Sequence, residues 1–240
     1  MSIRSRVDRP SHWLIGILLP LAFSLIAVES RAQDEYAVGT LPVVSFRKEW
    51  AEKTILEFDV ESRQFYVQGV FGGEDPQSDF LWTRTDVKAV ILRKLQNDHL
   101  IGGGYLFRYD DVKQKSFHRI IQQYKFSNEF DSFELGHQFK AEQIFGEGSK
   151  PRFRFRYALK PEFPLGESDD SPRALSAKVE NLYSIQGDES VYEVRLGAKY
   201  SFPVFSFMAM AVGPEYRVSP LNESDKEHQF LLVIAFDFEG

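Results

Sequence analysis

The stretch that decides the fold is PRFRFRYALKPEFPL, residues 151–165. Its first half alternates three basic side chains with three aromatic rings, namely Arg152, Arg154 and Arg156 with Phe153, Phe155 and Tyr157. Successive side chains of a β-strand point to opposite faces, so this strand would carry charge on one face and rings on the other. The stretch therefore predicts a strand that separates a polar environment from an apolar one.

The same two-residue period recurs along most of the chain. Residues 194–202 read VRLGAKYSF and residues 133–145 read FELGHQFKAEQIF, both with large apolar residues on one face and charged or polar residues on the other. Alternating segments of about ten residues are typical of transmembrane β-strands, whereas helical spacing fits few of these stretches. We predict strands at 53–64, 81–95, 99–110, 116–127, 131–145, 151–162, 175–187, 191–202, 205–213 and 228–238. A further strand at 41–48 is left open.

Turn signals separate several of these strands. Short polar turns are expected at 96–98, 127–129 and 187–189. Pro214 lacks an N–H group and is expected to end a strand or to lie in a bulge. The glycines of LIGGGYLF, residues 100–107, are expected to allow a bend or to leave room for a neighbouring ring.

Composition excludes several classes of function. The 240 residues include 29 basic and 35 acidic residues, a net charge of −6, so the chain has no basic field for binding nucleic acid. Cysteine is absent, which excludes disulfides and thiolate chemistry. No His, Asp and Glu cluster has the spacing of metal ligands, and we expect neither a metal nor a cofactor.

Residues 1–32 have the pattern of a secretory signal peptide. A positively charged start precedes the apolar run WLIGILLPLAFSLIAV, residues 13–28, and Ser30 and Ala32 are small residues that permit cleavage after Ala32. A membrane anchor is disfavoured because the run is shorter than the about 20 apolar residues of a spanning helix. We therefore expect an exported protein whose single domain is 33–240.

Two features favour an outer-membrane barrel over a soluble sandwich, which would also alternate. The chain ends in the aromatic strand FLLVIAFDF, residues 230–238, and outer-membrane barrels typically finish with such a strand, which the insertion machinery reads. Whole strands also carry rows of arginine or glutamate instead of a random polar mixture. We predict an all-β fold, a single antiparallel transmembrane β-barrel of about ten to twelve strands, with outer-membrane lipid and the barrel insertion machinery as its partners. A soluble periplasmic β-sandwich that binds a ligand is the alternative.

The charged faces of neighbouring strands are expected to meet in the lumen. Cross-strand neighbours on one face lie about 4.5–5.5 Å apart, close enough for acids and bases to pair. Roughly ten strands exceed the ~8 whose lumen side chains fill but fall well below the ~16 of an open porin. The expected lumen charge ladder consists of Arg119, Gln123, Glu134, Glu142, Arg152, Arg154, Arg156, Glu180, Arg195 and Lys199. Such a ladder either stiffens the lumen or binds or passes small anions.

Four segments carry a family resemblance through their order and spacing. FHRIIQQY (117–124) is similar to a His-Arg-x-x-Gln-Gln strand, PRFRFRYAL (151–159) to an arginine-rich strand, VENLYS (179–184) to an Asn-Glu-x-aromatic strand with its first two residues inverted, and RLGAKYSF (195–202) to a Gly-x-x-Tyr strand. In this order they resemble a family of small Gram-negative outer-membrane barrels classed as a domain of unknown function. The chain departs from the family pattern at Phe117, where an acid is frequent, and at Glu193, where an arginine is expected. The resemblance implies an outer-membrane barrel over most of the chain and no known reaction.

An outer-membrane lipid-modifying hydrolase is the alternative from a different class. It would need a serine, a histidine and an orienting acid or amide near one rim. His99 and His228 are expected at exposed rims, His118 on the face opposite Arg119, and His137 on an apolar face. No serine lies at a telling spacing from these rings, so no catalytic residue is assigned and we expect a non-catalytic protein.

Overall fold

The computed structural model describes residues 34–73, 75–95, 99–146, 148–165 and 173–240, and the predicted signal peptide lies outside them. The described residues form eleven β-strands. The strands are β1 (Glu35–Ala51), β2 (Thr54–Val70), β3 (Gln77–Lys94), β4 (Leu100–Asp110), β5 (Lys115–Glu129), β6 (Glu134–Gly146), β7 (Arg152–Pro164), β8 (Ala174–Gln186), β9 (Glu189–Phe205), β10 (Met208–Ser219) and β11 (Glu227–Glu239). Within the described ranges, no helix is long and apolar enough to cross a membrane.

The strands close into one barrel in chain order. Each strand pairs antiparallel with the next, and the barrel closes between β1 and β11, which run parallel. Because each strand of a meander reverses direction, an odd number of strands leaves the first and the last pointing the same way. The predicted closed barrel is confirmed, but the prediction that all strand pairs are antiparallel is wrong at this closing pair. The chain does not form the sandwich of two open sheets.

The strands are mostly longer than the alternating sequence segments predict. The strand left open at 41–48 is present as the centre of β1. The turn predicted at 187–189 is confirmed at 187–188, whereas Glu189 begins β9. The turn predicted at 127–129 is wrong, because these residues continue β5 and the chain reverses at 130–133. The turn predicted at 96–98 lies outside the described residues.

Pro214 does not end a strand but lies inside β10, opposite Leu232 of β11. The ladder between β10 and β9 pairs Val212 and Glu215 with their partners in one register and has no pairs at the two positions between them. The missing N–H group of proline is therefore accommodated where the ladder is already interrupted.

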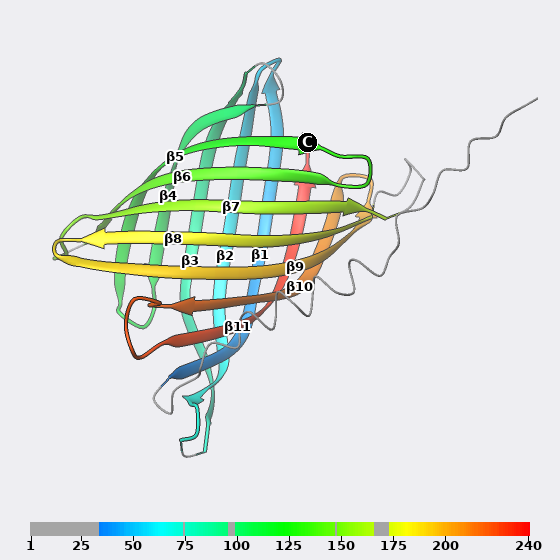
Figure 1. Cartoon of the computed structure of the whole chain (residues 1–240). Coiled ribbons are helices and arrows are strands. Elements are labelled where there is room, and N and C mark those ends of the chain that lie inside the picture. The colour runs from blue at the N-terminus through cyan, green and yellow to red at the C-terminus, as the bar shows by residue number, and fades with distance from the viewer. Residues whose placement is uncertain (1–33, 74, 96–98, 147, 166–172) are drawn as a thin grey trace, which may run out of the picture.

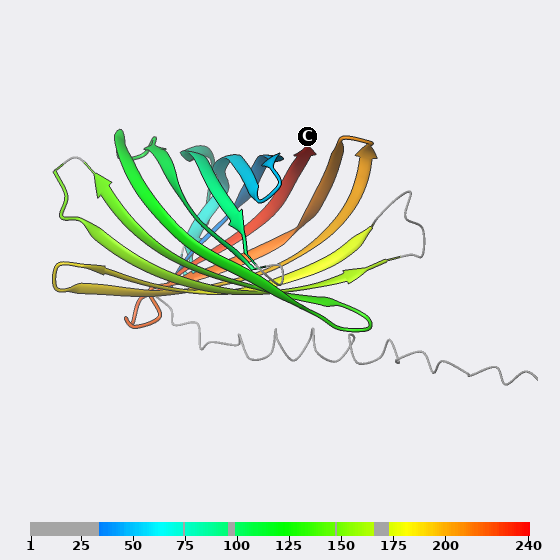
Figure 2. The same ribbon diagram turned by 90° about the horizontal axis from the view of Figure 1, so that it is seen from above.

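The barrel has two walls whose strands cross in projection. Figure 1 shows β6–β9 running across the view in front of β1–β3, which run from top to bottom. Seen from above in Figure 2, the strands curve strongly from one wall toward the other. Some of the buried apolar residues form two clusters, one on β1, β2 and β11 around Leu41 and Val233, and one on β2 and β3 around Ile55 and Leu92.

Two glycines of β4 bring this strand unusually close to β3. A Cβ atom at Gly102 would lie 2.0 Å from the carbonyl oxygen of Ile91, and one at Gly104 would lie 2.4 Å from that of Ala89. Both carbonyl groups belong to β3. The two glycines therefore leave room for the backbone of β3, whereas the sequence predicts a bend or room for a neighbouring ring. These close approaches shape the wall of the lumen beside β4.

Candidate functional site

Glu142 of β6 is the centre of the largest cluster of charges inside the barrel. Its carboxylate lies 3.3 Å from Arg119 of β5 and 3.1 Å and 3.8 Å from Arg156 and Arg154 of β7. Arg154 is the direct cross-strand neighbour of Glu142, whereas Arg156 reaches it diagonally from its position opposite Lys140. Three guanidinium groups thus share one buried carboxylate.

Arg156 connects this cluster to a second carboxylate, that of Glu180 on β8. The guanidinium of Arg156 lies 2.7 Å from Glu180, and Arg195 of β9 lies 3.7 Å from the same side chain. Arg195 also contacts Glu193 of its own strand at 2.5 Å. Arginine and glutamate side chains therefore form a continuous chain of ion pairs from β5 to β9. The arginines of β7 in this chain lie on one face of the strand, as the two-residue period of residues 152–157 predicts.

Some ion pairs reach past a neighbouring strand. Lys178 of β8 contacts Glu215 of β10 at 2.5 Å, and Gly197 of the intervening β9 lies opposite both of them. The absence of a side chain at Gly197 leaves the path between them open. Lys125 of β5 reaches past two strands and donates to both carboxylate oxygens of Glu57 on β2, at 2.8 and 2.9 Å.

A second group of charges on β2, β3 and β4 was not among the residues predicted for the ladder. Arg108 of β4 donates through two nitrogens to the two carboxylate oxygens of Asp86 on β3, at 2.7 and 2.5 Å. Arg84 of β3 lies 3.8 Å from Glu61 of β2, and Lys88 pairs with a carboxylate of β2. The signal was present in the alternation of residues 84–88, which read RTDVK.

These charges surround a cavity of about 130 Å³ inside the barrel. Eight basic and four acidic side chains line it, together with three apolar ones. The basic residues are Arg84, Lys88, Arg108, Arg119, Lys140, Arg154, Arg156 and Arg195, and the acidic residues are Asp59, Glu61, Asp86 and Glu142. The cavity therefore has an excess of positive charge.

Of the residues predicted for the ladder, Arg119, Glu142, Arg154, Arg156, Glu180 and Arg195 are brought together in one ion-pair cluster. The remaining four lie beside or beyond it. Gln123 is buried and accepts a hydrogen bond from Gln138 at 3.1 Å. Arg152, the first residue of β7, donates to Gln186 at 2.9 and 2.6 Å. Glu134 is exposed at the start of β6. Lys199 is half-buried and forms no ion pair with any described residue.

Each histidine in the described part of the chain interacts with a tyrosine hydroxyl. His99 pairs with Tyr124, His118 with Tyr105, His137 with Tyr157 at 2.9 Å, and His228 with Tyr216 at 2.7 Å. His118 is exposed on the outer face, opposite buried Arg119, as the two-residue period predicts.

The expectation that His228 lies at an exposed rim is wrong. Its side chain is only 4 % exposed, and its Nε2 lies 3.3 Å from the buried carboxylate of Asp34. The parallel pairing of β1 with β11 brings the two residues together, so the ring is buried at the seam that closes the barrel.

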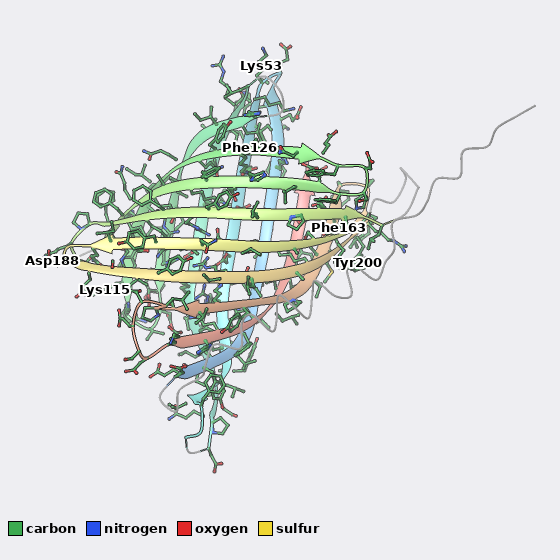
Figure 3. The ribbon with its side chains drawn as sticks, in the orientation of Figure 1. Lys53, Lys115, Phe126, Phe163, Asp188 and Tyr200 are labelled. Carbon is green, nitrogen blue, oxygen red and sulfur yellow. The ribbon has the colours of Figure 1, made fainter. Side chains whose placement is uncertain are left out.

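Aromatic rings cover the outer face of the barrel. Phe126 stacks on His137 with 4.4 Å between ring centroids, and a shallow groove of about 640 Å³ runs over β4–β9 between rings such as Phe139, Phe155 and Tyr183. Figure 3 shows Phe126, Phe163 and Tyr200 on the strands, while charged Lys53 and Asp188 lie at hairpin turns. Among the described residues, no group of three or more His, Asp or Glu side chains is arranged to hold a metal ion.

A closed barrel with rings outside and ion pairs inside defines the chain as a β-barrel protein with a polar lumen. More particularly, the family model described as a protein of unknown function, DUF2490, matches residues 45–228, so the chain belongs to this family. The match confirms the resemblance in the sequence and extends from the middle of β1 to the start of β11. No curated protein and no solved structure matches the chain.

Proposed function

We propose that the protein is an outer-membrane β-barrel whose narrow, charge-lined lumen has a structural or small-ligand-binding role. The observation that carries the proposal is an inverted distribution of polarity. Arg119 and Glu142 are 4 % and 2 % exposed inside the barrel, whereas Phe155 and Phe58 are 53 % and 44 % exposed outside it. A soluble protein normally buries its rings and exposes its charges, and contiguous apolar surface marks contact with a membrane or a partner.

The outer face also has the chemistry of a transmembrane barrel. Such barrels carry an apolar band flanked by aromatic residues at the two membrane interfaces. The tyrosine–histidine pairs on the outer face have apolar rings joined to polar tips, which suits them to an interface where one end is apolar and the other is wet. Each pair joins the Nδ1 atom of a histidine to a tyrosine hydroxyl, on a face that lipid would otherwise leave without hydrogen bonds.

The lumen supports a narrow barrel more than a wide pore. Eleven strands lie between the ~8 that side chains fill and the ~16 that leave an aqueous channel, and the ion pairs extend inward from both walls. A lipid-modifying hydrolase has less support. The histidines described above interact with tyrosine hydroxyls, and within the described part of the chain no serine, histidine and acid are held together.

The test is to fractionate expressing cells and to compare boiled and unboiled samples of each fraction by gel electrophoresis. We expect the protein in the outer-membrane fraction, with a band that migrates differently after boiling because a closed barrel resists detergent until it is heated. A periplasmic band released without detergent, with no change on boiling, would contradict the membrane assignment.

A second measurement separates a narrow lumen from a porin. Purified protein reconstituted into planar lipid bilayers is expected to produce no large, stable conductance steps, because charged side chains fill the lumen. A wide-pore barrel inserted in parallel under the same conditions is the positive control. Porin-like steps from the present protein would rule out the narrow lumen while leaving the barrel assignment intact.

A further inference from the structure

We propose that the cavity inside the barrel binds one small oxyanion, of the class of inorganic phosphate or sulfate. This inference deepens the proposed small-ligand role of the lumen and rests on it. The site lies between the two walls, with Arg84 of β3, Arg119 of β5 and Lys140 of β6 among its lining side chains.

The charges around the cavity are not balanced. The eight basic and four acidic side chains of its lining leave an excess of four positive charges. Glu180 and Glu193, outside the lining, pair with Arg156 and Arg195 and reduce this excess to two. Uncompensated buried charges cost several kcal/mol each, so a bound anion would supply the compensation that the protein lacks.

Several hydrogen-bond donors around the cavity also lack acceptors. The Nε atoms of Arg84 and Arg119 are buried and have no hydrogen-bond partner, and Lys140 forms neither a hydrogen bond nor an ion pair with any described residue. Buried polar groups are nearly always hydrogen-bonded, so such donors at one cavity need an explanation. Guanidinium and ammonium groups form strong, charge-assisted hydrogen bonds with phosphate oxygens. A small oxyanion would therefore be a suitable acceptor for Arg84, Arg119 and Lys140.

The carboxylates of the lining do not oppose an anion as free charges. Asp59 pairs with Lys88, and Asp86 is held by two nitrogens of Arg108. Glu61 lies 3.8 Å from a terminal nitrogen of Arg84, and Glu142 is shared by three arginines. Each negative charge is therefore already matched by a neighbouring cation. The Nε atoms of Arg84 and Arg119 and the ammonium group of Lys140 lie on different strands and remain for a ligand.

The volume limits the size of the ligand. About 130 Å³ is several times the ~30 Å³ that one water molecule occupies in the liquid. It is well below the ~300 Å³ at which pockets for drug-sized ligands begin. A single tetrahedral oxyanion with a few waters fits this range, whereas a nucleotide or an oligosaccharide does not.

The test is isothermal titration calorimetry of inorganic phosphate and of sulfate into the protein extracted from membranes in detergent. We expect saturable binding to one site and a Kd raised about tenfold or more by Lys140→Gln, because a hydrogen bond to a charged group is worth about 1.5–3 kcal/mol. Lys140→Arg keeps the charge and is expected to retain binding. Lys199→Gln is the matched control, since Lys199 is also an inward lysine without an ion pair among the described residues but does not line the cavity.

The outcomes separate this inference from the proposed function. Absence of saturable binding, or equal binding by wild type and Lys140→Gln, would overturn the anion site even when the protein is in the outer membrane and its migration changes on boiling. Binding by a protein found soluble in the periplasm would support the site and overturn only the membrane assignment. Arg84→Gln, on the opposite wall, provides an independent second variant with the same expected loss.

A final arm distinguishes a free anion from a phosphate group carried by a lipid. Titration with glycerol phosphate is expected to give no binding, because the cavity holds one small oxyanion without an attached chain. Binding of glycerol phosphate as tight as that of phosphate would overturn the assignment to a free oxyanion.

Discussion

Replacing Glu142 by glutamine is expected to destabilise the barrel by about 3–5 kcal/mol, the effect of removing one partner of a buried ion pair. The side chain is 2 % exposed, and its carboxylate lies within 4 Å of Arg119, Arg154 and Arg156. Glutamine keeps the shape but removes the charge that these guanidinium groups share. Arg156 retains Glu180 as a partner, whereas Arg119 and Arg154 lose their only ion-pair partner among the described residues.

The measurement is the denaturant midpoint of the purified barrel, read from the fraction of protein that still migrates as the unboiled form. The control is Glu134→Gln, on the same strand and the same face but exposed at its start, where the change is expected to stay within about 0.5 kcal/mol. Equal midpoints for Glu142→Gln and wild type would show that the charge ladder does not stabilise the barrel.

Replacing Gly102 by alanine is expected to prevent β4 from pairing normally with β3 and to cost at least about 3 kcal/mol. The added Cβ would lie 2.0 Å from the carbonyl oxygen of Ile91 and 2.8 Å from the side chain of Leu92. The first of these atoms is backbone, so the strand itself has to move. The expected result is a lower yield of the form that migrates differently after boiling.

The matched control is Gly103→Ala, the next residue of the same strand. Its Cβ would point to the other face. The nearest atom there would be the carbonyl oxygen of Ile121 at 3.4 Å, an ordinary van der Waals distance. We expect this variant to form the barrel with a stability within about 1 kcal/mol of wild type. A normal yield and midpoint for Gly102→Ala would contradict the close approach of β3 and β4.

The alternation of side chains predicted the strands and their two faces, whereas the terminal aromatic strand and the rows of charge favoured a barrel over a sandwich. Alternation is a local property, because neighbouring side chains of a strand must point to opposite faces. Residues 152–157 therefore show which side chains share a face without reference to the rest of the chain. The direction of the closing pair was not predictable in this way, since it depends on the parity of the whole strand count. The turn expected at 127–129 was wrong because polar residues can also continue a strand. Residues 127–129 are polar, yet they form the last part of β5.

The partners inside the lumen depend on the tertiary structure. Long arginine and lysine side chains reach diagonally or past a strand, so strand order does not determine which carboxylate Arg156 or Lys125 contacts. His228 is buried because closure of the barrel places it beside Asp34, 194 positions away in the chain. The sequence thus determined the polarity of each face through a local geometric rule. Only the closed and curved barrel decided which charges pair and where a positively charged cavity remains, because both depend on how the two walls approach each other.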